Sequence, residues 1–225
     1  MLYYSTGGDN SNSQECAADS AYFDGWLTAS HHCDWTGISC SCDNNCVGDV
    51  RDGKVRSITR ARSTCLTGTI PSALGSIQTL IYLTLNLNPG LTGTLPSELG
   101  QLQMLINLTL NGCDLEGSLP KELGMLHELG GVQLQGNRFN GTIPVEVGQW
   151  PKMSYFDLHN NAFTGTLPEE ICNVTSYRYI ISDDHLCNGL PPACCDACYL
   201  NGTTFPCPVW CPISGLWSEP SKKNE

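Results

Sequence analysis

The sequence is poor in basic residues and has no long apolar run. Its 11 Lys and Arg stand against 22 Asp and Glu, which gives a formal net charge of −11 and a pI of about 4.7. General nucleic-acid binding needs a basic footprint that so acidic a chain lacks. Every apolar stretch is too short to span a bilayer as a helix. Composition therefore argues against a general nucleic-acid-binding protein and against a membrane-spanning segment within this sequence.

Signatures of catalysis are missing as well. The five histidines share no motif with a Ser or Cys nucleophile. We find no Gly-x-Ser-x-Gly, no HExxH and no phosphate-cradling glycine loop. A redox Cys-x-x-Cys centre would need a βαβ setting, which the sequence does not show. We therefore expect a protein that is not an enzyme and that carries no cofactor.

Cysteine is almost absent from the middle of the chain and abundant at both ends. Of the 14 cysteines, six lie between Cys16 and Cys65, seven between Cys172 and Cys211, and only Cys113 lies between these groups. This distribution predicts disulfide-stapled caps in an oxidising compartment. The cysteines assigned to these disulfides are Cys33, Cys40, Cys42, Cys46, Cys172, Cys187, Cys195, Cys198, Cys207 and Cys211.

A zinc site is the alternative use of the C-terminal cysteines. Cys195 and Cys198 with Cys207, Cys211 and His185 have a spacing that could ligate zinc. The secretory features of the chain favour disulfides, and we expect no metal.

Four Asn-x-Ser/Thr glycosylation acceptors agree with a secretory route: Asn107, Asn140, Asn173 and Asn201. Residues 1–8 show neither the basic nor the apolar region of a signal peptide. We expect a mature or partial chain of a secreted or cell-surface protein. Such a chain would reach a membrane only through an anchor in a longer parent chain.

What the sequence has in abundance is one repeated phrase, Leu/Phe-x-Gly-Thr/Ser-Ile/Leu-Pro. Its first residues, at 66, 91, 115, 139 and 163, are 25, 24, 24 and 24 residues apart. A fixed period of this length predicts a solenoid, in which each unit buries its apolar face against its neighbours. The five copies are Leu66–Pro71, Leu91–Pro96, Leu115–Pro120, Phe139–Pro144 and Phe163–Pro168.

Each repeat predicts a short strand, a turn and a short 3-10 helix. Alternating apolar residues such as Leu83 and Leu85 indicate a strand with one face in the core, and stacked strands form a parallel sheet with about 4.8 Å per repeat. The Asn that follows, such as Asn88, is expected to bond to backbone groups that the turn leaves unpaired. The Pro and the later Leu-Gly pair mark the ends of the 3-10 helix.

Three features modify this pattern. Cys113 takes the Asn position of its repeat, which predicts a buried free thiol with a structural role. The extra residue before Leu91 predicts a bulged turn. A Glu column follows the prolines, where carboxylates offset exposed N–H groups, and a cation-binding ridge is the alternative. The column consists of Glu98, Glu122, Glu146 and Glu170.

These patterns resemble the plant-type leucine-rich repeat, L-x-x-L-x-x-L-x-L-x-x-N-x-L-x-G-x-I/L-P-x-x-L-G-x. Residues Cys33–Cys40 are similar to its N-terminal cap signature, C-x-W-x-G-V-x-C. The resemblance implies an α/β fold: a short right-handed solenoid with a parallel sheet on its concave face, second short strands and 3-10 turns elsewhere, and cysteine-rich caps at both ends. The implied divisions are an N-terminal cap (1–65), about five repeats (66–173), a C-terminal cap (174–198) and a Pro-rich tail or linker (199–225).

The candidate binding site is the outward-facing side of the predicted strands, which we call the concave strip. Residues that flank the core leucines point away from the core. A sugar on Asn107 would move binding to the edges of the strip, and a merely solvated sheet face is the alternative. The strip consists of Tyr82, Thr84, Asn86, Asn107, Thr109, Asn111, Gln133, Gln135, Tyr155, Asp157 and His159.

The resemblance implies non-catalytic extracellular recognition of a protein, peptide or glycan, with no nucleic-acid partner, in a receptor-like or adhesion protein. One alternative is a secreted inhibitor of a cell-wall hydrolase. A second alternative is ice binding by a hydroxyl ladder in the repeated phrase. This ladder consists of Thr69, Thr94, Ser118, Thr142 and Thr166.

Overall fold

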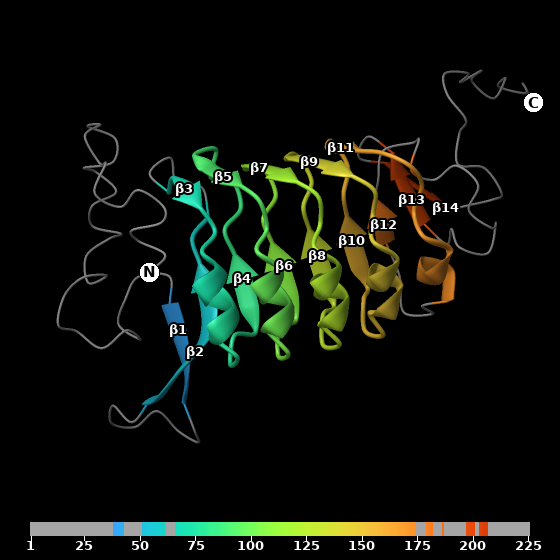
Figure 1. Ribbon diagram of the computed structural model, residues 1–225. Coiled ribbons are helices and arrows are strands. Elements are labelled where there is room, and N and C mark those ends of the chain that lie inside the picture. The colour runs from blue at the N-terminus through green and yellow to red at the C-terminus, as the bar shows by residue number, and fades with distance from the viewer. Residues whose placement is uncertain are drawn as a thin grey trace, which may run out of the picture.

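A computed structural model describes residues 38–42, 51–61, 66–173, 179–181, 186, 197–200 and 203–206 of the 225-residue chain. The described part is a stack of coils with strands along two of its sides (Figure 1). The predicted solenoid is therefore confirmed. The caps and the tail lie largely outside the described residues, so the domain boundaries remain predictions.

The larger sheet holds nine strands in the order β1-β2-β4-β6-β8-β10-β12-β13-β14. It is parallel from β2 to β13, and antiparallel pairs, β1 with β2 and β13 with β14, end it on both sides. Its strands are β1 (Ile38–Cys42), β2 (Arg51–Thr59), β4 (Tyr82–Thr84), β6 (Asn107–Thr109), β8 (Gly131–Gln133), β10 (Tyr155–Asp157), β12 (Tyr179–Ile181), β13 (Ala197–Leu200) and β14 (Thr203–Pro206).

The smaller sheet contains the repeated phrase. Its five parallel strands have the order β11-β9-β7-β5-β3, so each copy pairs with the next. The bounds are β3 (Gly68–Thr69), β5 (Leu91–Gly93), β7 (Asp114–Gly117), β9 (Arg138–Gly141) and β11 (Ala162–Phe163).

The helical turns of the coils are all 3-10 helices, and no α-helix occurs among the described residues. Each follows a proline of the phrase, and in η3 the N–H of Leu99 donates to the Pro96 carbonyl at 3.1 Å. The predicted 3-10 turns are confirmed. They are η2 (Ser72–Ser76), η3 (Ser97–Gln101), η4 (Lys121–Met125), η5 (Val145–Gln149) and η6 (Glu169–Asn173).

The periodic apolar residues form one continuous core. Leu83, Leu108 and Phe156 point inward from their strands and are 0% exposed. In the later coils larger side chains replace leucines: Trp150 meets Phe156 edge to face at 5.3 Å and donates its indole N–H to the Leu123 carbonyl at 2.8 Å. Each coil thus buries apolar surface against both neighbours, which is how a solenoid obtains its stability.

The Leu-Gly pair of each 3-10 helix sets how closely coils can stack. A Cβ placed on Gly100 would lie 2.3 Å from the backbone oxygen of Glu122 in the next coil. Gly75, Gly124 and Gly148 have the same relation to the Glu of the coil that follows each of them. Glycine is required here because backbone occupies the space that a side chain would need.

An asparagine ladder connects the coils at the turn. The Asn137 amide donates to the carbonyls of Leu110, in the preceding coil, and Leu134, in its own, at 2.9 and 3.0 Å. Its oxygen accepts the Leu115 N–H at 3.1 Å. Asn161 makes all three corresponding bonds, and Asn88 makes the two corresponding donor bonds. The predicted task of these asparagines is confirmed.

Cys113 continues the ladder with a donor alone. Its thiol is free, buried and 3.2 Å from the Leu85 carbonyl. No acceptor is needed here, because the N–H of Leu91 already donates to the Asn88 carbonyl at 3.0 Å within the bulged turn. Burial raises the pKa of the Cys113 thiol, and backbone hydrogen bonds at Asn88 and Leu87 offset part of that rise. A buried, protonated thiol is unreactive, as a structural role requires.

The ten cysteines assigned to disulfides lie either outside the described residues or in segments whose side chains are not described, and their pairing remains a prediction. Of the four predicted glycosylation acceptors, the side chain of Asn173 and the whole of Asn201 are not described. Asn140 is exposed, and Asn107 is half-buried. Within the described ranges, no helix is long and apolar enough to cross a membrane.

Candidate functional site

The concave strip forms straight rows across four coils. Tyr82 pairs with Asn107, and Asn107 with Gly131, which in turn pairs with Tyr155. A second row runs through Thr84, Thr109, Gln133 and Asp157 in the same registers. Because side chains two residues apart on a strand share a face, a third row follows, formed by Asn86, Asn111, Gln135 and His159. The sequence-predicted residues are therefore brought together on one surface.

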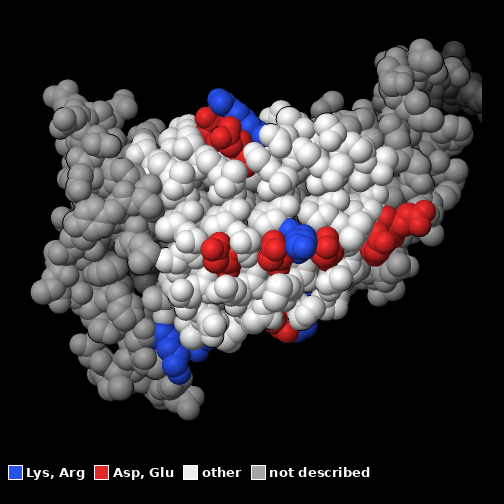
Figure 2. Space-filling view, in the orientation of Figure 1, with Lys and Arg blue, Asp and Glu red and all other residues white. Residues whose placement is uncertain are grey.

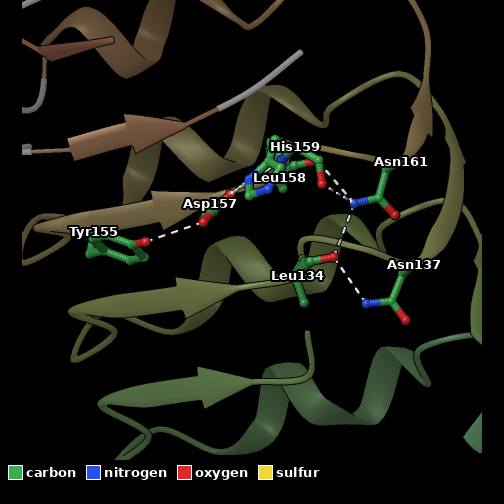
Figure 3. A network of polar contacts seen from close by, with 7 residues as sticks. All are labelled: Leu134, Asn137, Tyr155, Asp157, Leu158, His159 and Asn161. Atoms are coloured by element: carbon green, nitrogen blue, oxygen red, sulfur yellow. Dashed lines mark hydrogen bonds and ion pairs between the residues drawn. The ribbon is translucent and has the colours of Figure 1, made fainter. Parts of the chain in front are cut away.

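Asp157 differs from the others because it is buried, with 1% exposure. Its carboxylate accepts a hydrogen bond from the Tyr155 hydroxyl at 3.1 Å and lies 2.6 Å from Nδ1 of His159 (Figure 3). The backbone N–H of His159 also donates to it at 3.3 Å. We expected Asp157 to face solvent, whereas the structure uses it to hold the Tyr155 and His159 side chains in place. A ligand would meet those two residues rather than the carboxylate.

The third row carries an unusual feature. Asn86, Asn111 and Gln135 each have a side-chain oxygen that is shielded from solvent and accepts no hydrogen bond from the described residues. Buried polar atoms are nearly always paired in proteins. The asparagine ladder lies beside this row and is bonded throughout.

Sequence reasoning missed Leu87, which borders the strip. It has a positive φ of 59° and is 37% exposed. Gly112, Gly136 and Asn160 occupy the same position in the next coils with φ of 67°, 68° and 55°. The left-handed region suits Gly and Asn and is unfavourable for Leu. An alignment of the repeats places Leu87 at a position that is otherwise Gly or Asn, and this could have revealed the strained residue from sequence alone.

The hydroxyl ladder of the repeated phrase is exposed along its length, at Thr69, Thr94, Ser118, Thr142 and Thr166. Its first four side chains lie against glycines of the next coil, and a Cβ on Gly117 would be 2.7 Å from the Thr94 methyl group. The glycines beside the ladder, Gly93, Gly117, Gly141 and Gly165, all have positive φ.

The predicted acidic column lies on the 3-10 helices, and a row of acidic side chains crosses that face of the molecule (Figure 2). Glu98, Glu122 and Glu146 each lie in the first turn of their helix. Among the described residues, no group of three or more His, Cys, Asp or Glu is placed to hold a metal ion.

Comparison with protein families identifies the repeat. The family model described as Leucine Rich Repeat matches residues 152–174. No curated protein matches the chain significantly by sequence.

Solved structures with the same fold are numerous. One is a chain of the BIR3–SERK2 complex from Arabidopsis thaliana, with 24% identity, a TM-score of 0.64, and coverage of 85% of this chain and 95% of that one. The HAESA ectodomain from Arabidopsis in complex with an IDA peptide hormone has 20% identity, a TM-score of 0.54 and coverage of 85% and 35%. A plant ice-binding protein has 20% identity, a TM-score of 0.54 and coverage of 77% and 70%.

At these identities the likeness establishes the fold, and the chain is a leucine-rich-repeat solenoid similar to plant receptor ectodomains. The expected resemblance is confirmed.

Proposed function

We propose that this protein is a non-catalytic extracellular recognition module that binds a protein or peptide through the concave strip. The observation that carries the proposal is the strip itself, in which four in-register coils present polar and aromatic side chains on one surface. The similar ectodomains were solved with a protein or a peptide hormone bound, which supports the same class of partner here. The same likeness and the cysteine distribution support a position outside the cell.

The side chains of the strip also support binding without catalysis. The Asp157–His159 pair has the hydroxyl of Tyr155 as a further partner, not a serine or cysteine nucleophile. Tyr82 is 44% exposed at the other end of the strip. Tyrosines that combine an apolar ring with a polar tip are favoured contact residues at protein interfaces.

Replacing Tyr82 or Tyr155 by Ala should weaken partner binding at least tenfold, because truncating an aromatic anchor at an interface typically costs about 2 kcal/mol. The measurement is titration against the tightest ligand from a peptide and glycan array. Met125→Ala is the matched control, since Met125 is 52% exposed but lies on η4, away from the strip. Unchanged binding in both tyrosine variants would remove the strip from the interface.

A further inference from the structure

Leu87 has a side chain that its turn does not require. Its φ of 59° lies in the left-handed region, which is unfavourable for Leu and is tolerated by Gly and Asn. The next three coils place Gly112, Gly136 and Asn160 at this position. Backbone strain of this kind is retained mostly at functional sites, such as those that hold a ligand. The outlier therefore points to a use for the Leu87 side chain.

Packing within the chain uses only part of this side chain. The Cδ2 methyl group of Leu87 lies over Gly112 in the next coil, 2.6 Å from the place of an added Cβ. The residue is nevertheless 37% exposed, whereas the core leucines Leu85 and Leu91 are 0% exposed. Leu87 therefore presents apolar surface to solvent at the border of the concave strip.

The backbone beside Leu87 is bare over the next two coils. Gly112 and Gly136 carry no side chain and are half-buried, and the row continues to the exposed Asn160. A Cβ added to Gly136 would meet no atom closer than the Cα of Gly112, at 3.7 Å. There is thus room above these glycines. We call Leu87 together with Gly112 and Gly136 the Leu87 ledge.

The charges around the ledge are already balanced. The turns that contain it and their neighbours are residues 84–90, 109–114, 133–138 and 157–162, and their Asp, Glu, Lys and Arg side chains are Asp114, Arg138 and Asp157. Asp114 and Arg138 form an ion pair with each other. Asp157 is buried and hydrogen-bonded. A charged side chain of a partner would lose water here without gaining a new counter-charge from these segments, so the ledge favours an apolar group.

We propose that the Leu87 ledge takes an apolar side chain of the protein or peptide partner. Leu87 forms its wall, and the backbone of Gly112 and Gly136 forms its floor. Covering Leu87 removes exposed apolar surface from water, and the missing Cβ atoms let the partner approach the backbone closely. This inference rests on the proposed function, because it assigns a specificity subsite within the same interface.

The test uses a dodecapeptide selected against the full chain from a random phage-displayed library. The peptide is resynthesised with each of its apolar residues replaced in turn by Ser. Leu87→Asn removes the wall and keeps a residue that tolerates positive φ. Gly136→Asn covers the floor, with the residue type that stands at this position in the next coil. Val145→Asn is the matched control, because Val145 is a 55% exposed apolar residue on η5, away from the strip.

For the wild type, Ser at one apolar position of the dodecapeptide should weaken binding about tenfold. Leu87→Asn should bind the parent dodecapeptide about tenfold more weakly. Its loss on the Ser replacement should shrink to about twofold, because residues in direct contact have non-additive effects. Gly136→Asn should also weaken binding, and Val145→Asn should bind like the wild type. The melting temperature of Leu87→Asn should be no lower than that of the wild type, because the strain is relieved.

The inference is overturned if no dodecapeptide binds, or if Leu87→Asn binds the parent dodecapeptide as tightly as the wild type. It is also overturned if Leu87→Asn keeps the full tenfold preference at every position, or if its melting temperature falls, which would make Leu87 a structural residue. With any of the results on Leu87→Asn, weaker binding by Tyr82→Ala or Tyr155→Ala would leave the proposed function standing. Unchanged binding in the tyrosine variants as well would overturn both.

Discussion

Gly100→Ala is expected to lower the free energy of unfolding by about 3 kcal/mol, because the added methyl group overpacks a rigid contact. Its Cβ would lie 2.3 Å from the Glu122 oxygen and 2.8 Å from the Glu122 carbonyl carbon. These are backbone atoms of the next coil, so no side chain can move aside, and the two coils must separate. For a chain of this size the melting temperature should fall by about 10 °C.

The matched control is Gly130→Ala. At Gly130 the nearest atom to an added Cβ is the Lys152 oxygen at 3.6 Å, an ordinary contact distance, and its φ is not in the left-handed region. This substitution should change stability by no more than about 0.5 kcal/mol. The measurement is the melting temperature of each variant relative to the wild type. Equal melting temperatures would show that the Leu-Gly pair does not set the spacing between coils.

Asn137→Ala should destabilise the protein by about 4 kcal/mol, because it leaves two buried backbone groups without a partner and removes one of the two donors of a third. The Leu110 carbonyl loses its donor, and the N–H of Leu115 loses its acceptor. The Leu134 carbonyl loses one donor and keeps the Asn161 amide at 3.0 Å. Cys113→Ala, at the same position of the preceding coil, should cost only about 1 kcal/mol. The Cys113 thiol supplies a weak donor, and the N–H that would need an acceptor is bonded within its own turn.

Equilibrium unfolding in urea measures both variants. A difference of about 3 kcal/mol between them would establish that the bulged turn at Asn88 removes the need for an asparagine at position 113. Equal losses would mean that the ladder contributes through its donors alone, or not at all.

The scaffold could be predicted because its determinants repeat. Leucines at fixed spacing define the core, the proline fixes the start of each 3-10 helix, and Asn137 has a ladder role that the turn dictates. Each of these follows from local geometry repeated at a constant period. Even the free, buried state of Cys113 followed from its place in the pattern.

The details of the strip could not be predicted because they depend on how neighbouring side chains orient. Asp157 occupies an outward position in the pattern. It is nevertheless buried, and its carboxyl group is bonded to Tyr155 and His159. The unpartnered amide oxygens are equally a matter of orientation, since the residue type alone does not say whether Asn111 is bonded. Cys113 can lack an acceptor atom only because the N–H of Leu91, in the preceding coil, donates to the Asn88 carbonyl.

The central claim is that the strip across β4, β6, β8 and β10 is the surface that contacts the partner. Hydrogen–deuterium exchange, with and without the tightest ligand from the peptide and glycan array, tests it most directly. We predict slower exchange in residues 82–87, 107–112, 131–136 and 155–160, with no change in η3, η4 and η5. Protection confined to those 3-10 helices, with the strip unchanged, would contradict the account.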